Sequence, residues 1–262
     1  MKNYNEFENE LFEEWKARSL DNNDGDELVS DGLLYRGNIE YNSDGNWVHN
    51  KGNESELWEK SAKRILILSK DLNDDEAWDV RGETGRKNKL GQDNIIIVTA
   101  RFYKNMMIWI YGLLNVDKNG KTPDFDAIDS SIIYQPFFDK APIARINCKK
   151  QVGKGEIENV ALQDFMERYK DLLIKQINAY DADIILCFGG KSIIKDFVAD
   201  HCIDDLEKVN NYIFYSKLLN KIVIDAYHPS YLGHSNKELY TELMKNYEEF
   251  IKNNLSFLKP CR

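Results

Sequence analysis

The sequence predicts an α/β protein of three layers, α/β/α, whose central sheet has four strands and is mainly parallel. Four short runs are apolar without polar alternation, and helical patterns separate them. The runs are residues 64–68, 142–146, 183–188 and 221–226. Continuous apolar strands that alternate with helices are typical of a parallel sheet covered on both faces.

The first element is a helix over residues 5–20, where Phe7, Leu11, Phe12 and Trp15 have helical spacing. The following segment, 21–54, is rich in Asp, Asn and Gly, which indicates an ordered excursion with little regular structure. We therefore expect residues 1–60 to form a helix and an irregular extension packed on a core domain of residues 61–262.

Further helices are expected between and after the strands, over residues 101–114, 159–180, 191–199 and 236–253. Residues 211–216 are a candidate antiparallel strand, because Leu218-Leu219-Asn220 provides a short turn into the last run. Residues 94–98 fit either a strand or the approach to the next helix.

Composition favours one globular unit, since 42% of the 262 residues are hydrophobic and 12% aromatic. No stretch approaches the ~20 apolar residues of a membrane span, and the first 14 residues are acidic. We expect a cytoplasmic monomer with no membrane partner.

The cysteines show no Cys-x-x-Cys pair, which argues against a zinc site or an iron–sulfur cluster. They are Cys148, Cys187, Cys202 and Cys261. We expect reduced thiols, no metal site and no cofactor.

The net charge of −9 opposes nonspecific attraction to nucleic acid, so a nucleic-acid partner requires a local basic face. Candidates for this face are Lys149, Lys150, Lys154, Arg81, Arg86 and Lys191. Of these, Lys149, Lys150, Lys191 and Arg81 are expected to form a basic or neutral rim around the site. For any one of them alone, a solvated loop charge is the simpler interpretation.

Polar or glycine residues follow all four predicted strands, at Ser69-Lys70-Asp71, Asn147-Cys148-Lys149, Gly189-Gly190-Lys191 and Tyr227-His228-Pro229. Ligands of open parallel sheets bind beyond the carboxyl ends of the strands. We therefore expect Asp71, Asn147 and His228 to converge on one pocket there.

Each candidate has a chemical and a structural interpretation. Asp71 suits the activation of water or the stabilisation of positive charge, or else it caps a helix or belongs to an acidic surface loop. The Asn147 carboxamide offers a donor and an acceptor to a planar ligand, or it satisfies loose backbone groups. His228 precedes a proline, which stiffens its turn. The Gly189-Gly190 turn lacks the spacing of a phosphate-binding loop.

Taken together, these segments resemble the uracil-DNA glycosylase superfamily over residues 63–233. The first motif is Ser69-Lys70-Asp71-Leu72-Asn73, with its Asp retained, and a later strand ends in Asn147. The third strand ends in Gly189, and His228-Pro229-Ser230-Tyr231-Leu232 resembles the His-Pro-Ser-x-Leu loop. In the family, glycine, proline and an aromatic residue stand at the positions of Ser69, Leu72 and Asn73.

The resemblance implies a DNA-repair hydrolase that cleaves the N-glycosidic bond of a flipped uracil or related modified base. Asp71 would position water, His228 would stabilise charge on the base, and Asn147 would bind the base edge. Ser69, Lys70 and Asn73 would add substrate contacts. Trp78 is the first choice for the stacking aromatic residue and Phe102 the second.

The resemblance also implies a DNA partner, single-stranded or uracil-containing. Leu232 would wedge into the base stack and should therefore be exposed. The remaining DNA contacts would come from Ser230, Tyr231, Lys149 and Lys191.

Two alternatives share this fold, since one fold hosts many activities. The first is a catalytically inactive nucleic-acid or nucleotide-binding member with a sensor or defence role. The second is a small-molecule hydrolase that uses the Asp71–His228 pair.

Overall fold

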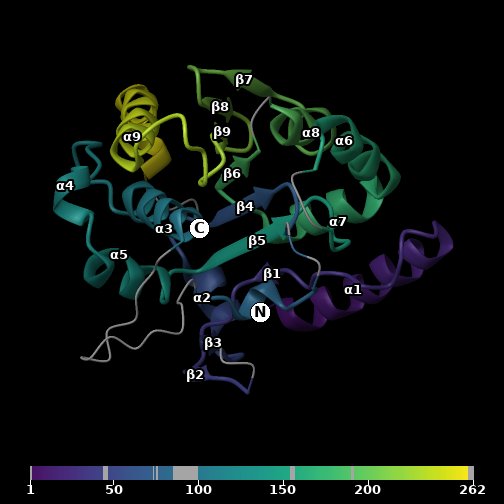
Figure 1. Cartoon of the computed structure of the whole chain (residues 1–262). Helices are drawn as coiled ribbons and strands as arrows, with labels where there is room; N and C mark the ends of the chain where they lie inside the picture. The colour runs from purple at the N-terminus through teal and green to yellow at the C-terminus, as the bar shows by residue number, and fades with distance from the viewer. Residues whose placement is uncertain are drawn as a thin grey trace.

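A computed structural model describes residues 2–43, 47–72, 74, 76–84, 100–153, 157–189 and 192–258. The described chain folds around a seven-stranded mixed sheet of strand order β1-β5-β4-β6-β9-β8-β7 (Figure 1). The four parallel strands are β4 (Ile65–Ser69), β5 (Ile143–Asn147), β6 (Ile184–Phe188) and β9 (Lys221–Ala226). These are the four apolar runs of the sequence, so the predicted parallel core is confirmed.

The predicted strand number of four is wrong, because antiparallel strands extend both edges. β1 (Gly32–Leu33) pairs with β5, and β8 (Ile213–Ser216) joins β9 to β7 (Leu206–Lys208). Only β8 lies in a segment expected to add a strand. β1 has two residues and β7 is mostly exposed, so neither leaves a run of apolar residues in the sequence.

Helices cover both faces of the sheet (Figure 1). One face carries α3 (Arg101–Leu114), α4 (Phe125–Ile128), α5 (Ser131–Phe138) and α9 (Asn236–Asn253). The other carries α1 (Tyr4–Asp21), α6 (Asn159–Arg168), α7 (Lys170–Tyr180) and α8 (Ile193–His201). The three-layer arrangement follows from strands that are apolar on both sides.

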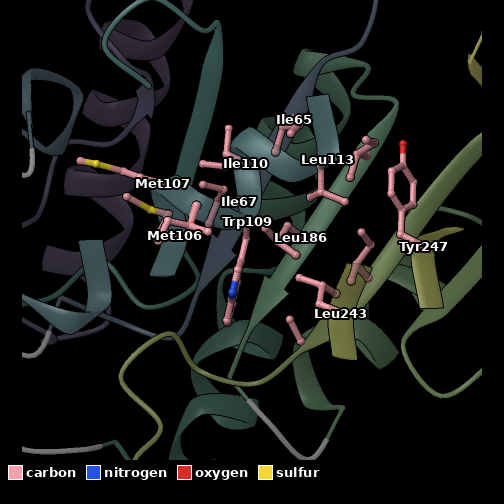
Figure 2. Packing of buried hydrophobic residues seen from close by; sticks show 14 of the residues in the cluster. Ile65, Ile67, Met106, Met107, Trp109, Ile110, Leu113, Leu186, Leu243 and Tyr247 are labelled. Carbon is pink, nitrogen blue, oxygen red and sulfur yellow. The ribbon is translucent and has the colours of Figure 1, made fainter. Parts of the chain in front are cut away.

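Alternation along β4 divides its side chains between the two cores. Ile65 and Ile67 belong to the core beneath α3, whereas Leu66 and Leu68 belong to the core beneath α7. Figure 2 shows Met106, Trp109, Ile110 and Leu113 of α3 lying against Ile65, Ile67 and Leu186. Burying these side chains is the main force that fixes the helix on the sheet.

The predicted helices over residues 101–114 and 236–253 are confirmed with their bounds. The pattern over 159–180 forms two helices instead of one, because Tyr169, with φ −110° and ψ 19°, leaves the helical conformation between α6 and α7. The region predicted at 94–98 lies outside the described residues.

The N-terminal segment contributes to the sheet as well as covering it. β1 comes from the segment expected to be irregular, as do the hairpin strands β2 (Ile39–Tyr41) and β3 (Trp47–His49). The helix α2 (Glu54–Lys60) follows them. Short 3-10 turns lie at Val80–Gly82 and Leu255–Leu258. Within the described ranges, no helix is both long enough and apolar enough to cross a membrane.

The direction in which the chain adds strands to the sheet reverses at β4, and this reversal indicates where a ligand site would lie. It reaches β5 through α3 to α5 on one face, and then crosses to β6 through α6 and α7 on the other. In open α/β sheets, ligand crevices form at such a reversal beyond the carboxyl ends of the strands.

Candidate functional site

Ser69 and Asn147 are register partners at the carboxyl ends of β4 and β5. Ser69 lies two residues after Ile67, and Asn147 lies two residues after Arg145. Because alternate side chains of a strand point to the same face, Ser69 and Asn147 point to the face of the sheet that α3 covers. Ser69 is 2% exposed and Asn147 is 0% exposed. The serine hydroxyl and both polar atoms of the carboxamide have no hydrogen-bond partner within the described structure. Buried polar groups without partners are uncommon in folded proteins, and two adjacent ones can form hydrogen bonds with a polar ligand or a water.

The backbone of Asn147 is held by other residues. Its N–H donates to Asp31 Oδ2 at 2.8 Å, and its carbonyl oxygen accepts from Lys150 Nζ at 3.2 Å. The Asn147 side chain is therefore not needed to satisfy the strand end, which was its simpler interpretation. It remains available as one donor pair and one acceptor.

His228 lies in a tightly held turn after β9. The Ser230 backbone N–H donates to His228 Nδ1 at 3.2 Å, and the Tyr231 N–H donates to the His228 carbonyl at 2.8 Å. Asn105 of α3 donates to the Pro229 carbonyl at 2.6 Å, which ties the turn to the helix. Because Nδ1 accepts a hydrogen bond, the neutral ring carries its proton on Nε2. An exposed His228 thus presents an N–H donor.

Phe102, at the start of α3, lies beside this imidazole. Its ring centroid is 5.5 Å from that of His228 and 6.1 Å from that of Phe188, the last residue of β6. The Arg145 guanidinium lies over the Phe102 ring, 4.9 Å from its centroid. An aromatic residue at this place can stack on a flat ligand next to the histidine donor.

Trp78 lies in a neighbouring hydrogen-bond network around Glu83. The Trp78 indole N–H donates to Glu83 Oε1 at 3.0 Å, and the Tyr103 hydroxyl donates to the same oxygen at 2.8 Å. The guanidinium of Arg145 pairs with Glu83 Oε2. Trp78 is 39% exposed, but its ring nitrogen already donates to Glu83, and the aromatic ring that lies beside His228 is that of Phe102.

Sequence analysis missed Arg145 and Glu83. Arg145 is the only charged residue inside the otherwise apolar run 142–146, and that interruption was an available signal. Burial lowers the pKa of Arg145, but the Glu83 charge and Tyr103 outweigh it, so the pKa is raised overall. The same Glu83 charge adds to burial in raising the pKa of Tyr103.

Asp71 and Lys70 lie at the end of β4, against the segment that follows β5. The backbone N–H of Lys149 donates to the Lys70 carbonyl at 2.8 Å. Burial lowers the pKa of Lys149, and the nearby Asp71 charge opposes this. A Cβ on Gly189 would lie 3.2 Å from Lys70 Cγ, so the glycine lets the Lys70 side chain pass over the end of β6.

The predicted basic rim is wrong at two positions. Lys150 is 0% exposed and pairs with Asp31, while Arg81 is 6% exposed and pairs with Asp79 and Glu8. Both cations lie next to carboxylates of the N-terminal half, which draw them inward. Lys149 is half-buried and donates to the carbonyls of residues 151 and 152.

The expectation that Leu232 is exposed is confirmed, at 82%. Tyr231 beside it is 42% exposed and stacks on Tyr227 with ring centroids 4.8 Å apart. Four other candidates, Asn73, Arg86, Lys154 and Lys191, lie outside the described residues.

No protein-family model matches the chain, and a search of curated proteins finds no match to it. In the part of the chain that the structure describes, no three His, Cys, Asp or Glu residues are grouped to hold a metal ion.

Proposed function

We propose that this chain is a hydrolase of the DNA-glycosylase type, which cleaves the N-glycosidic bond of a flipped uracil or related modified base. The observation that supports it most is the buried Asn147 carboxamide, whose nitrogen and oxygen have no hydrogen-bond partner among the described residues. A base edge with adjacent carbonyl and N–H groups would satisfy both atoms at once.

In this proposal the flipped base stacks on Phe102 and not on Trp78, because Phe102 adjoins His228. His228 donates its Nε2 proton in a hydrogen bond to a carbonyl oxygen of the base. Asp71 positions a water whose oxygen bonds to the anomeric carbon. The N-glycosidic bond breaks, and its electron pair leaves with the base. The attacking water loses one proton to solvent, and the base anion takes up one proton from solvent.

The His228 hydrogen bond strengthens as negative charge develops on the base. One such preorganised donor contributes ~3–4 kcal/mol to transition-state stabilisation. The turn that holds it is fixed through Ser230 and Asn105 before substrate arrives, so little reorganisation is needed.

The carboxamide of Asn147 is covered in this structure. A base therefore reaches it only after neighbouring side chains move, so binding and rearrangement are coupled. The exposed Leu232 is suited to fill the gap left in a duplex when a base is extruded.

A second candidate is a nucleoside or nucleotide ligand in place of DNA. The burial of Lys150 and Arg81 in ion pairs favours it, because these cations then offer little attraction to a phosphate backbone. The same Asn147 and Phe102 contacts would serve a free nucleoside.

One assay separates the two candidates. Release of free base is measured from single-stranded and double-stranded uracil-containing oligonucleotides, and from deoxyuridine. Base release from the oligonucleotides alone supports the glycosylase, and release from deoxyuridine alone supports the second candidate. Loss of release in Asp71→Asn and His228→Ala assigns the chemistry to these residues, whereas binding without release by the wild type rejects a hydrolase.

A further inference from the structure

We propose that Asp31 and Lys150 are positioning residues that hold Asn147 in place and keep its side chain available for the ligand. The inference rests on the proposed role of Asn147 in binding a base. It assigns a specific task to a residue of the N-terminal segment, which sequence analysis treated as an extension.

The pair is a compact, buried ion pair. Lys150 Nζ lies 2.7 Å from both carboxylate oxygens of Asp31, and each side chain is 1% exposed. Gln176 of α7 donates to Asp31 Oδ1 at 2.9 Å, and the Lys150 ammonium lies 5.0 Å from the centroid of Trp15. Residues from α1, β5 and α7 thus fix both partners.

The reason for the pair is found in the strand ladder. Along β5, residues 143, 145 and 147 direct their backbone groups toward β1, but the β1 pairing stops at Gly32 opposite Arg145. Beyond that point, no strand among the described residues pairs with Asn147 on that side. The Asp31 carboxylate accepts its N–H, and Lys150 donates to its carbonyl. The Asp31 and Lys150 side chains therefore take the place of a neighbouring strand for the backbone of Asn147.

Stability alone is a weak reason for this arrangement. Desolvating two charges is costly, and apolar replacements of a buried ion pair are often equally stable or more so. Packed apolar side chains, however, would leave both backbone groups of Asn147 without partners. Its own carboxamide would then be drawn into local hydrogen bonds, as asparagine side chains commonly are.

The experiment compares Asp31→Asn and the double variant Asp31→Leu/Lys150→Met with the wild type. Asp139→Asn is the matched control, because Asp139 is also a buried carboxylate beside a basic side chain, with His49 Nε2 3.2 Å from its Oδ1. Urea unfolding gives the stability of each variant. Nitrogen–proton spectra and amide hydrogen exchange report the Asn147 backbone and carboxamide, and base release from a uracil-containing oligonucleotide reports activity.

We expect the double variant to fold, to lose protection of the Asn147 amide and to shift its carboxamide resonances. Its kcat for base release should fall roughly 10–100-fold, the size expected of small misplacements in an active site. The control should lose stability while the Asn147 signals and kcat stay as in the wild type.

Unchanged Asn147 exchange and carboxamide resonances in the double variant would overturn the proposal. If the double variant does not fold, the same spectra of Asp31→Asn decide. A wild type that neither releases nor binds base would reject the proposed function instead, and the spectra would still decide whether Asp31 and Lys150 hold Asn147.

Discussion

The imidazole of His228 and the ring of Phe102 lie with centroids 5.5 Å apart and planes tilted by 41°. His228 follows β9, the last parallel strand along the chain. Phe102 lies at the start of α3, in the connection between β4 and β5. Arg145 lies over the same Phe102 ring, so a residue from β5 completes the arrangement. Residues that follow β9, begin α3 and lie within β5 thus meet near the carboxyl ends of the parallel strands.

Replacing His228 tests the proposed donor. Since its Nε2 proton would stabilise charge on the departing base, His228→Ala should reduce single-turnover base release by about 10²–10³-fold. Urea unfolding should show that the variant still folds, because the side chain is exposed and Asn105 continues to hold the turn through the Pro229 carbonyl. His201→Ala, the same change on α8, is the control and should release base at the wild-type rate. Equal rates for all three proteins would contradict the assignment.

Breaking the Arg145–Glu83 pair tests the network beside Phe102. Their side chains are 5% and 12% exposed, so Arg145→Met leaves a nearly buried carboxylate without its cation. We expect a loss of about 3–5 kcal/mol in the free energy of unfolding. The double variant Arg145→Met/Glu83→Gln should recover much of it. If the single and double variants are equally stable, loss of the Arg145–Glu83 ion pair does not explain the fall in the free energy of unfolding.

Leu232 is tested by comparing substrates. A wedge helps only where a base must be unstacked, and unstacking costs a few kcal/mol. Leu232→Ala should therefore slow base release from a duplex far more than from a single strand, with stability changed by less than about 0.5 kcal/mol. Equal losses on the two substrates would leave Leu232 without a role in duplex opening.

Glu8 makes stability depend on pH. Burial raises its pKa from 4.5 to about 7, although Tyr180, the Leu33 amide and Arg81 oppose this. Because the folded pKa lies above the unfolded one, its contribution is complete below pH 4.5 and is lost as the pH rises through about 7.

Glu8→Gln removes this titration. We expect the stability of the wild type relative to Glu8→Gln to fall between pH 5 and pH 8, by on the order of 3 kcal/mol. Urea unfolding at several pH values measures the difference. Glu10→Gln, at an exposed position on the same helix, is the control for the substitution itself. A difference between the wild type and Glu8→Gln that does not change with pH would place the pKa of Glu8 near its unfolded value.

The sequence predicted the elements whose buried residues recur with the spacing of a strand or a helix. The four parallel strands are apolar on both sides, and the bounds of α3 and α9 follow from helical spacing. β1 was missed because two residues in a polar segment carry no periodicity. Tyr169 was missed as a break because a helical pattern continues on both sides of it.

The candidate site was predicted less completely, for a physical reason. Positions at strand ends can be inferred from the fold, and the places of Asn147 at the end of β5 and of His228 after β9 were predicted in this way. Ion pairs depend on which segments meet in space, so Lys150 and Arg81 were expected at the surface although Asp31 and Glu8 draw them inside. Arg145 alone left a visible trace, as a charge within an apolar run.

The short outer strands have a consequence for self-association. Strand edges with free backbone groups can add a strand from a second molecule, which leads to aggregation. At one edge, β7 has only three residues, and Glu207 and Lys208 are exposed there. At the other, Asp31 and Lys150 occupy the groups of Asn147 where β1 ends. Addition of a foreign strand is therefore opposed by charge at one edge and by occupied hydrogen bonds at the other.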